Sequence, residues 1–202
     1  MEKIVLLLSG GLDSSLLLSI LSKQGFKVLP LFIDYGQRNK NQELKAARYI
    51  SKHHNCNLHR IEVGPIFKDS LLIKGSNSQS AFLPHRNLLF LVLGAIHAFN
   101  NKCNVVAIAL HAGSNYPDSS KSFVQQATKS IGESIGKEVI IHAPFIDITK
   151  NDIAYMAYLV KLPIDKTYSC YLGESEHCQK CGACLQRFDS LREVRKHIPA
   201  DI

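Results

Sequence analysis

Short apolar runs alternate along the chain with longer segments in which apolar positions recur every three or four residues. The short runs are rich in β-branched residues and predict strands, whereas the longer segments predict helices. The expected strands cover residues 3–8, 27–33, 57–63, 104–110 and 138–142. The expected helices cover residues 13–24, 42–54, 86–100, 120–135, 150–160 and 185–197. This alternation predicts a doubly wound, Rossmann-like α/β fold with a parallel sheet that binds ligands at the carboxyl ends of its strands.

The length and composition favour one main domain without a membrane span. The chain has 202 residues, of which 46% are hydrophobic and 20% are charged, enough for one sizeable core. No run of 18 apolar residues occurs, and the apolar run near the N-terminus is too short for a secretory signal. We therefore expect a cytoplasmic protein with an α/β domain over residues 1–165. A C-terminal segment, residues 166–202, is expected to pack on that domain.

The net charge of +7 would suit an anionic partner, but the 24 lysines and arginines are scattered along the chain. They form no block of five or more, and no basic helix with interleaved aromatic residues stands out. The phosphates of a nucleotide are a sufficient explanation for the charge. Nucleic acid is not expected as a partner.

The sequence SGGLDSS, residues 9–15, lies between the first expected strand and the first expected helix. At such a junction the free N–H groups and the helix dipole favour an anion, and glycine lets the backbone approach phosphate oxygens. Asp13 or Ser14 is able to cap the helix. The segment matches neither the P-loop of NTPases nor the dinucleotide fingerprint. Local chemistry alone leaves both a plain turn and a phosphate cradle open.

Four of the six cysteines fall within fifteen residues near the C-terminus: Cys170, Cys178, Cys181 and Cys184. Four thiolates at this spacing are able to close a tetrahedral zinc site that has no open position for catalysis. An iron–sulfur cluster is the alternative metal centre, because four cysteines suit both. His177 is an alternative ligand, although we prefer the all-cysteine set. Cys56 and Cys103 lack such neighbours and are expected to be small buried hydrophobic residues.

The SGGLDSS loop after an apolar strand resembles the SGGxDS pyrophosphate loop of the PP-loop ATPases. Members of that superfamily cleave ATP between its α and β phosphates and adenylate their substrates. The resemblance implies that Asp13 lies near the Mg²⁺ of ATP. The residues that it implies in ATP binding form one continuous stretch: Leu8, Ser9, Gly10, Gly11, Leu12, Asp13, Ser14, Ser15, Leu16, Leu17 and Leu18.

Further motifs resemble one family within that superfamily, the 7-cyano-7-deazaguanine synthases. They occur in the same order as in the family: DYGQR (34–38), PHRNLL (84–89), YPD (116–118), HAPFIDITK (142–150) and YSCY (168–171) before the cysteine cluster. The likeness covers residues 4 to about 195. It implies a homodimeric enzyme that uses ATP to convert 7-carboxy-7-deazaguanine and ammonia into a nitrile and carries one structural Zn²⁺ per chain.

Six side chains are candidates for catalysis or substrate binding, and the family motifs favour a site role over a structural one for two of them, Arg38 and Arg86. Arg38 and Arg86 are expected, with Asp13, to be catalytic, because the guanidinium fork matches the planar oxyanions of phosphate and carboxylate. His111, Asp118 and Lys150 are candidates for substrate binding. For each side chain an ordinary structural role, such as a surface ion pair or a turn, is the alternative.

The chain departs from the family pattern in places that bear on the product. Ser119 and Ser120 stand where the family has Cys-Arg, Asn39 stands where it has histidine, and the loop over residues 111–116 is short. One alternative is therefore a relative that stops at the amide or joins the deazaguanine carboxylate to another amine, such as one on a protein. A tRNA-modifying PP-loop protein and a nonenzymatic nucleotide-binding protein are further alternatives.

Overall fold

The computed structural model describes residues 1–64, 66–74, 76, 79–114 and 116–196. Its centre is a five-stranded sheet, entirely parallel, with the strand order β3-β2-β1-β4-β5. The strands are β1 Lys3–Leu7, β2 Lys27–Asp34, β3 His59–Glu62, β4 Val105–Ala107 and β5 Ile140–His142. The order reverses between β1 and β4, and this confirms the predicted doubly wound sheet.

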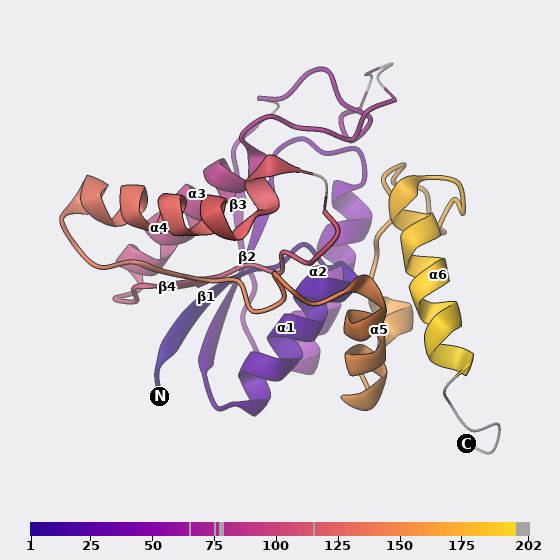
Figure 1. Cartoon of the computed structure of the whole chain (residues 1–202), viewed down its shortest axis with the longest axis horizontal. Coiled ribbons are helices and arrows are strands. Elements are labelled where there is room, and N and C mark those ends of the chain that lie inside the picture. Colours follow the sequence, from indigo (N-terminus) through magenta and orange to yellow (C-terminus); the bar gives the residue numbers. More distant parts are fainter. Residues whose placement is uncertain (65, 75, 77–78, 115, 197–202) are drawn as a thin grey trace.

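Six α-helices and two short 3₁₀ turns accompany the strands in the described residues (Figure 1). The helices are α1 Leu12–Lys23, α2 Lys40–His53, α3 Arg86–Asn100, α4 Lys121–Ile135, α5 Lys150–Leu159 and α6 Gly182–Lys196. The 3₁₀ turns are η1 Pro117–Ser119 and η2 Ile164–Lys166. Each expected helix is present, although residue 197, the expected end of the last, lies outside the described residues. None of the described helices combines the length and apolarity needed to cross a bilayer.

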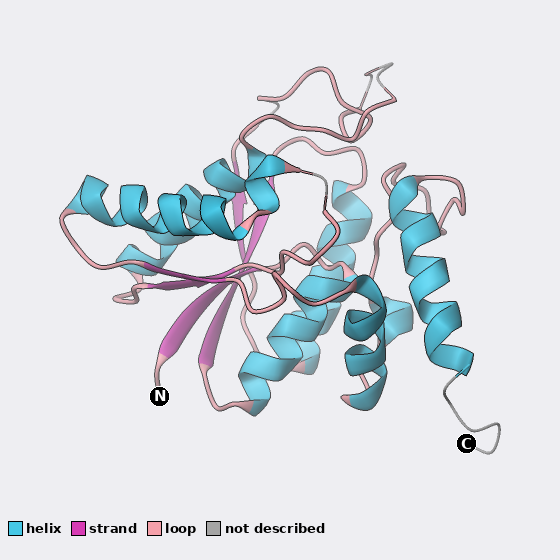
Figure 2. Ribbon diagram, viewed as in Figure 1, coloured by secondary structure: helices cyan, strands magenta, loops and turns pink. Residues whose placement is uncertain are grey.

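The helices form two layers, one on each face of the sheet (Figure 2). Successive residues of β1 point to opposite faces, as the period of two requires. Leu6 packs in the core on the side of α1, α2 and α5, whereas Val5 packs in the core on the side of α3 and α4. Helix α6 packs against α5 and adds Val194 to the first of these cores. Both faces of the sheet are thereby shielded from water.

The expected strand over residues 104–110 is shorter in the structure, because β4 covers only Val105–Ala107. Its outer partner β5 is also three residues long, which limits the parallel pairing. One further hydrogen bond, from the N–H of Ile108 to the carbonyl of His142 (3.0 Å), continues the ladder. Beyond it the chain leaves the sheet, so residues 109–111 face the open edge where the strands end.

The turn from β1 into α1 lies directly against helix α2. Gly10 has a φ of +80°, in the left-handed region that favours glycine. A Cβ atom placed there would lie 2.5 Å from the carbonyl oxygen of Glu43 and 2.7 Å from the nitrogen of Ala47, both backbone atoms of α2. The loop therefore approaches α2 as closely as a residue without a side chain allows.

We expect Gly10→Ala to lower the melting temperature more than Gly25→Ala, the matched control. Gly25 also has a positive φ (+86°), but nothing lies within 4 Å of a Cβ there. Both variants therefore have a left-handed strain of about 1–2 kcal/mol, and only Gly10→Ala adds a backbone clash. Thermal unfolding monitored by circular dichroism measures both shifts. Equal shifts would contradict the close approach of the loop to α2.

Candidate functional site

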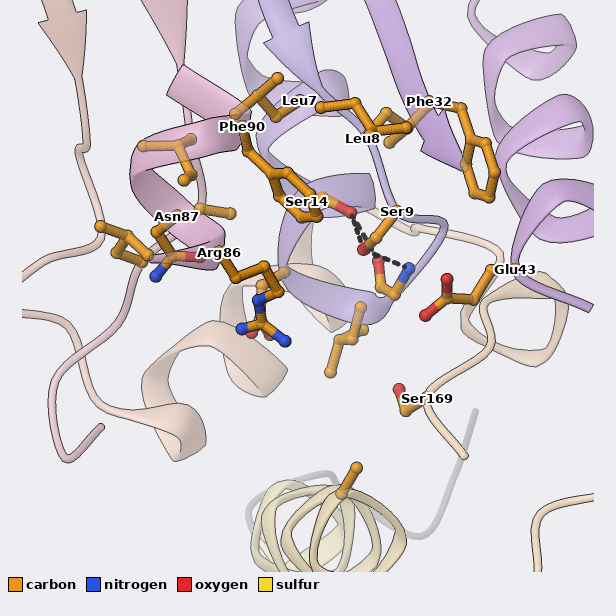
Figure 3. Close-up of a pocket in the computed structure, with 18 of the residues that line it drawn as sticks. Leu7, Leu8, Ser9, Ser14, Phe32, Glu43, Arg86, Asn87, Phe90 and Ser169 are labelled. Carbon is orange, nitrogen blue, oxygen red and sulfur yellow. Dashed lines mark hydrogen bonds between the residues drawn. The ribbon is translucent and has the colours of Figure 1, made fainter. Parts of the chain in front are cut away.

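A cavity of about 310 Å³ opens at the carboxyl edge of the sheet, where the strand order reverses. Its wall combines the ends of β1, β2 and β4, the first residues of α1, α3 and α5, and the segment between η2 and α6. Ligands in open α/β sheets bind at such a switch point. Figure 3 shows polar side chains extending into this cavity from several of these elements.

The loop that begins α1 is held by its own hydroxyl groups. The Oγ atoms of Ser9 and Ser14 lie 3.1 Å apart, and Ser9 Oγ accepts a hydrogen bond from the N–H of Gly11 (3.3 Å) (Figure 3). Gly11 is the N-cap of α1, and no side chain caps this helix. The first-turn N–H groups of a helix lack intrahelical partners. The cavity therefore meets an uncapped, electropositive helix end that is suited to an anion.

Asp13, Lys150 and His111 lie together on the cavity wall. Lys150 Nζ donates a hydrogen bond to Asp13 Oδ1, and both side chains are 17% exposed. His111 Nε2 lies 4.0 Å from Asp13 Oδ2, while His111 Nδ1 donates to the carbonyl oxygen of Ala112 (2.7 Å). The structure thus brings together three of the predicted site residues, which come from α1, α5 and the loop after β4.

Arg86, the first residue of α3, lines the same cavity and extends into it (Figure 3). Its positive charge acts on the side chains of Tyr35, Tyr171 and Glu43 and favours their ionised forms. Burial nevertheless raises the pKa of Tyr35. Arg86 is therefore the cationic group opposite Glu43 in the cavity.

Of the predicted catalytic and substrate-binding residues, Arg38 and Asp118 lie outside this wall. Arg38 Nη2 contacts the carbonyl oxygen of Ser76 (3.5 Å), so its guanidinium lies over a loop. Asp118 caps α3, because its Oδ2 accepts from the N–H of Asn87 (3.1 Å) and its carbonyl accepts from Asn87 Nδ2 (2.9 Å). Asp118 therefore touches the start of the helix that carries Arg86. Its tertiary contact supplies the cap that His85, the N-cap residue of α3, does not provide.

The expected ATP-binding stretch divides between the cavity and the core. Part of it lines the cavity, namely Leu8, Ser9, Gly11, Leu12, Asp13 and Ser14. Gly10 faces α2. The remaining four residues are buried in α1, namely Ser15, Leu16, Leu17 and Leu18. ATP binding by this stretch stays a prediction, and the cavity-lining residues are those with access to a ligand.

Glu43, on the first turn of α2, was not among the predicted site residues. Its carboxylate points into the cavity (Figure 3). Its Oε1 accepts from Asn39 Nδ2 (3.0 Å), and its Oε2 accepts from Gln37 Nε2 (3.1 Å). Burial raises its pKa to about 7, although these two hydrogen bonds and the charge of Arg86 oppose the shift. Glu43 is thus a carboxyl group that titrates near neutral pH in the candidate site.

The DYGQR turn that supports Glu43 is anchored by Asp34, a buried carboxylate at the end of β2. Burial acts to raise its pKa, but the N–H of Gly36 (3.0 Å) and the charges of Arg60 and Lys40 lower it below its usual value. Asp34 is therefore ionised at neutral pH and fixes the turn. Its contacts direct the following residues, Tyr35 and Gln37, to the cavity wall.

The four predicted metal ligands converge at one point. The Sγ atoms of Cys170, Cys178, Cys181 and Cys184 all lie within 4.8 Å of one another. Cys178 Sγ and Cys184 Sγ are 3.8 Å apart, which matches the separation of about 3.8 Å for two thiolates on a tetrahedral zinc with Zn–S distances of about 2.3 Å. Nε2 of His177 instead accepts from the N–H of Ser169 (3.2 Å). The geometry thus fits one metal ion held by four cysteines.

The cysteine segment also forms part of the cavity wall. Cys170 stands between Ser169 and Tyr171, which both line the cavity, and its carbonyl accepts from Asn39 Nδ2 (2.8 Å). The buried Arg187 of α6 donates to Ser169 Oγ (3.2 Å), to Thr167 Oγ1 (2.8 Å) and to the carbonyl of Ile164 (2.7 Å). The cysteine cluster and the cavity therefore share one stretch of backbone.

The residues that depart from the family pattern have definite contacts. Ser119 Oγ accepts from Asn87 Nδ2 (3.3 Å), and Ser120 Oγ caps α4 by accepting from the N–H of Phe123 (3.2 Å). Asn39 joins Glu43 to the cysteine segment. Residue 115, in the short loop after β4, lies outside the described residues.

Several residues of the cavity wall were not predicted as site residues from the sequence, although they lie within motifs that resemble the family. Tyr35 and Gln37 lie within DYGQR, and Ser169 and Tyr171 lie within YSCY. A signal for them was available, because the family likeness covers both motifs in full. Glu43 had no such signal, since a glutamate on the first turn of a helix is ordinary.

Comparison with known proteins gives a consistent result. A family model described as queuosine biosynthesis protein QueC matches residues 3–195. The 7-cyano-7-deazaguanine synthase of Aquifex aeolicus (strain VF5) is 34% identical, and the match covers 96% of this chain and 98% of that protein. The one from Picrophilus torridus is 32% identical over 96% and 89%. The solved structure of NMN synthetase from Francisella tularensis resembles this chain in fold, with a TM-score of 0.53 and 19% sequence identity. The match covers 100% of this chain and 89% of that protein.

The raised pKa of Glu43 predicts a pH-dependent contribution to stability. The pKa is about 7 in the folded protein against an ordinary value of 4.5, so ionisation of Glu43 destabilises the fold as the pH rises through this interval. The difference in melting temperature, Glu43→Gln minus wild type, should therefore be larger at pH 8 than at pH 5. A change of roughly 2–4 °C corresponds to about 1 kcal/mol in a chain of this size.

Differential scanning calorimetry across this pH range measures the difference. Arg86 and Asp34, the charged groups that act on Glu43, are unchanged in the variant. The control is Glu133→Gln, which removes a carboxylate from the exposed face of α4, outside the cavity wall. A difference for Glu43→Gln that is constant from pH 5 to pH 8 would contradict the raised pKa.

Proposed function

Because the chain belongs to the QueC family of queuosine biosynthesis proteins, we propose that its cavity converts 7-carboxy-7-deazaguanine and ammonia into 7-cyano-7-deazaguanine. The reaction uses ATP and releases AMP and pyrophosphate, so the chain is an AMP-forming, ligase-type enzyme. One observation carries the proposal: the uncapped start of α1 meets Lys150 and Arg86 in a single cavity at the switch point of the sheet. Uncapped helix ends and paired cations suit the phosphates of a nucleotide.

The proposed reaction requires ATP to activate the carboxylate and requires no nucleophilic side chain. A carboxylate is a poor electrophile until transfer of AMP to its oxygen makes that oxygen a leaving group. Attack by ammonia then releases AMP and forms an amide. A second adenylation, on the amide oxygen, allows loss of AMP with formation of the nitrile. The protein positions the reactants and stabilises the developing charge.

The residues of the cavity divide this work. The N–H groups at the start of α1 and the hydroxyls of Ser9 and Ser14 hold the departing pyrophosphate. Lys150 and Arg86 balance negative charge on the phosphates and on the substrate carboxylate. Asp13 would hold Mg²⁺ through its carboxylate, and the bound ion would neutralise phosphate charge. The contact of Asp13 with Lys150 and His111 keeps this carboxylate at the mouth of the loop.

The cysteine cluster is proposed to hold a structural Zn²⁺. Its four sulfur atoms would fill every position of a tetrahedral Zn²⁺, which would leave no coordination site for a substrate. Burial and the neighbouring thiols raise the pKa of Cys184, and a metal ion would offset this by stabilising the thiolate. The ion would order the backbone on which Ser169 and Tyr171 stand. Zinc therefore supports the cavity without entering the reaction.

The remaining features of the proposal concern partners and location. Ammonia is the proposed amine, and the active form is proposed to be a homodimer in the cytoplasm. Amide formation alone, transfer of the carboxylate to an amine on a protein, and modification of tRNA are other activities that the sequence leaves open. No contact in the described part of the chain favours any of these three.

The proposal predicts AMP and the nitrile when the protein is incubated with ATP, ammonium and 7-carboxy-7-deazaguanine. Mass spectrometry identifies the products, and the amide should be an intermediate. Asp13→Asn should reduce AMP release by about 100-fold or more, because it removes the carboxylate that is proposed to hold the Mg²⁺ of ATP. Glu133→Gln is the exposed control and should retain full activity.

Three outcomes would count against the nitrile. AMP without any deazaguanine product would contradict the substrate, whereas amide without nitrile would identify an enzyme that stops one step earlier. Intact ATP after incubation would indicate a nucleotide-binding protein without this activity.

Purified protein should contain about one zinc per chain, and Cys178→Ser should lose most of it. The variant should also melt at a lower temperature and bind the substrate several-fold more weakly, because the bound metal would order the backbone that positions Ser169 and Tyr171. Elemental analysis and calorimetry measure these changes. Cys56→Ser is the control, since Cys56 lies outside the cluster. A brown, iron-containing protein would contradict the assignment of zinc.

A further inference from the structure

The wall of the cavity carries two acidic residues in the described part of the chain, Asp13 and Glu43. Their partners differ in charge. Asp13 is paired with the ammonium of Lys150 and lies near His111. Glu43 accepts hydrogen bonds from two neutral amides, those of Gln37 and Asn39. Glu43 is therefore the acidic group in the cavity that the proposed nucleotide chemistry does not use.

From this arrangement we propose that Glu43 selects the substrate by accepting hydrogen bonds from the N1–H and the 2-amino group of its guanine-like ring. This inference rests on the proposed function, because it names what recognises the substrate of that reaction. A carboxylate has two oxygens with about four lone-pair sites. One amide bond to each oxygen leaves one acceptor site on each for a ligand.

The carboxylate is held in a fixed orientation by its neighbours. Gln37 Oε1 accepts from the N–H of Tyr35 (2.9 Å), and Gln37 Nε2 donates to the carbonyl of Ile33 (3.2 Å) as well as to Glu43. These backbone contacts fix which end of the amide faces Glu43. Asn39 Nδ2 is fixed in the same way by the carbonyl of Cys170. Such support preorganises a binding group before the ligand arrives.

The polarity of the cavity matches the polarity of the substrate. Figure 3 shows Arg86 and Glu43 extending into the cavity from opposite sides. One end of 7-carboxy-7-deazaguanine is a carboxylate, which suits Arg86, and the other carries two adjacent N–H donors, which suit Glu43. Tyr35, Phe32 and Phe90 also line the cavity and supply apolar wall against which a flat ring is able to lie.

The same chemistry separates the substrate from ATP. The pairing edge of adenine presents one amino donor beside a ring nitrogen that is an acceptor. A carboxylate would match the donor and repel the acceptor. A guanine-like edge presents two neighbouring donors, and burying them without an acceptor would be unfavourable. Glu43 therefore favours the deazaguanine over the adenine ring, and hydrogen bonds from the substrate would stabilise its ionised form.

The test compares 7-carboxy-7-deazaguanine with its analogue that lacks the 2-amino group, using ATP and ammonium throughout. Wild type should use the analogue with a kcat/KM about 10- to 100-fold lower, the discrimination expected for one well-made polar contact. Glu43→Ala should reduce this preference to within about threefold, and the KM for ATP should stay unchanged. Glu43→Gln keeps the shape of the side chain and should lose most of the preference. Glu133→Ala should keep it in full.

Each other outcome would overturn the inference. A wild-type enzyme that uses both compounds equally well would overturn it without any variant. So would a folded Glu43→Gln or Glu43→Ala protein that keeps the full preference. An equal loss of activity towards both compounds in these variants would show a purely structural role. Failure of the proposed function is separately visible, because wild type would then release no AMP with either compound, and this result would overturn both proposals.

Discussion

The close approach of the β1–α1 loop to helix α2 is the constraint on which the candidate site depends. At Gly10 the loop lies against the backbone of α2, where a side chain would overlap the carbonyl of Glu43. The carbonyl of Gly10 also accepts from the N–H of Tyr168 (2.9 Å), so the same residue contacts the C-terminal segment. One position without a side chain thus brings together the start of α1, the first turn of α2 and the backbone that leads to Ser169. The start of α1, the carboxylate of Glu43 and the far wall of the cavity therefore all depend on the packing at Gly10.

The cysteine segment adds a second constraint that acts on the same wall of the cavity. Asn39 connects the carbonyl of Cys170 with the carboxylate of Glu43, and Arg187 ties Ser169 to η2. Both links consist of hydrogen bonds between buried or partly buried groups. Such bonds are strong in a low dielectric, and loss of one partner leaves a buried polar group unpaired, which is unfavourable. A disturbance of the cysteine cluster would therefore reach the cavity through the backbone and through Asn39. The cysteine cluster and the cavity wall are therefore not structurally independent.

The layout of strands and helices could be predicted from the sequence because it depends on local periodicity, and every expected element is present. The glycine turn and the four cysteines were also recognisable, since their chemistry is carried by residues close together in the chain. Glu43 was not, because its role arises from neighbours supplied by the turn after β2 and by the segment around Cys170. Arg38 and Arg86 looked alike as arginines within motifs, yet Arg86 starts a helix that faces the cavity and Arg38 lies over a loop. Tertiary packing distinguishes such residues, and local pattern does not.

The contact between Gly10 and Tyr168 also has a consequence for the order of events during synthesis. The loop that would hold the nucleotide leaves the ribosome well before Tyr168, Ser169 and Tyr171, which lie far downstream in the chain. N-terminal segments fold as they emerge, but contacts between distant parts of a chain must wait for both. A nascent chain would therefore have a formed loop and no closed cavity. The cavity is completed only after the segment around Tyr168 has been synthesised and has reached the loop.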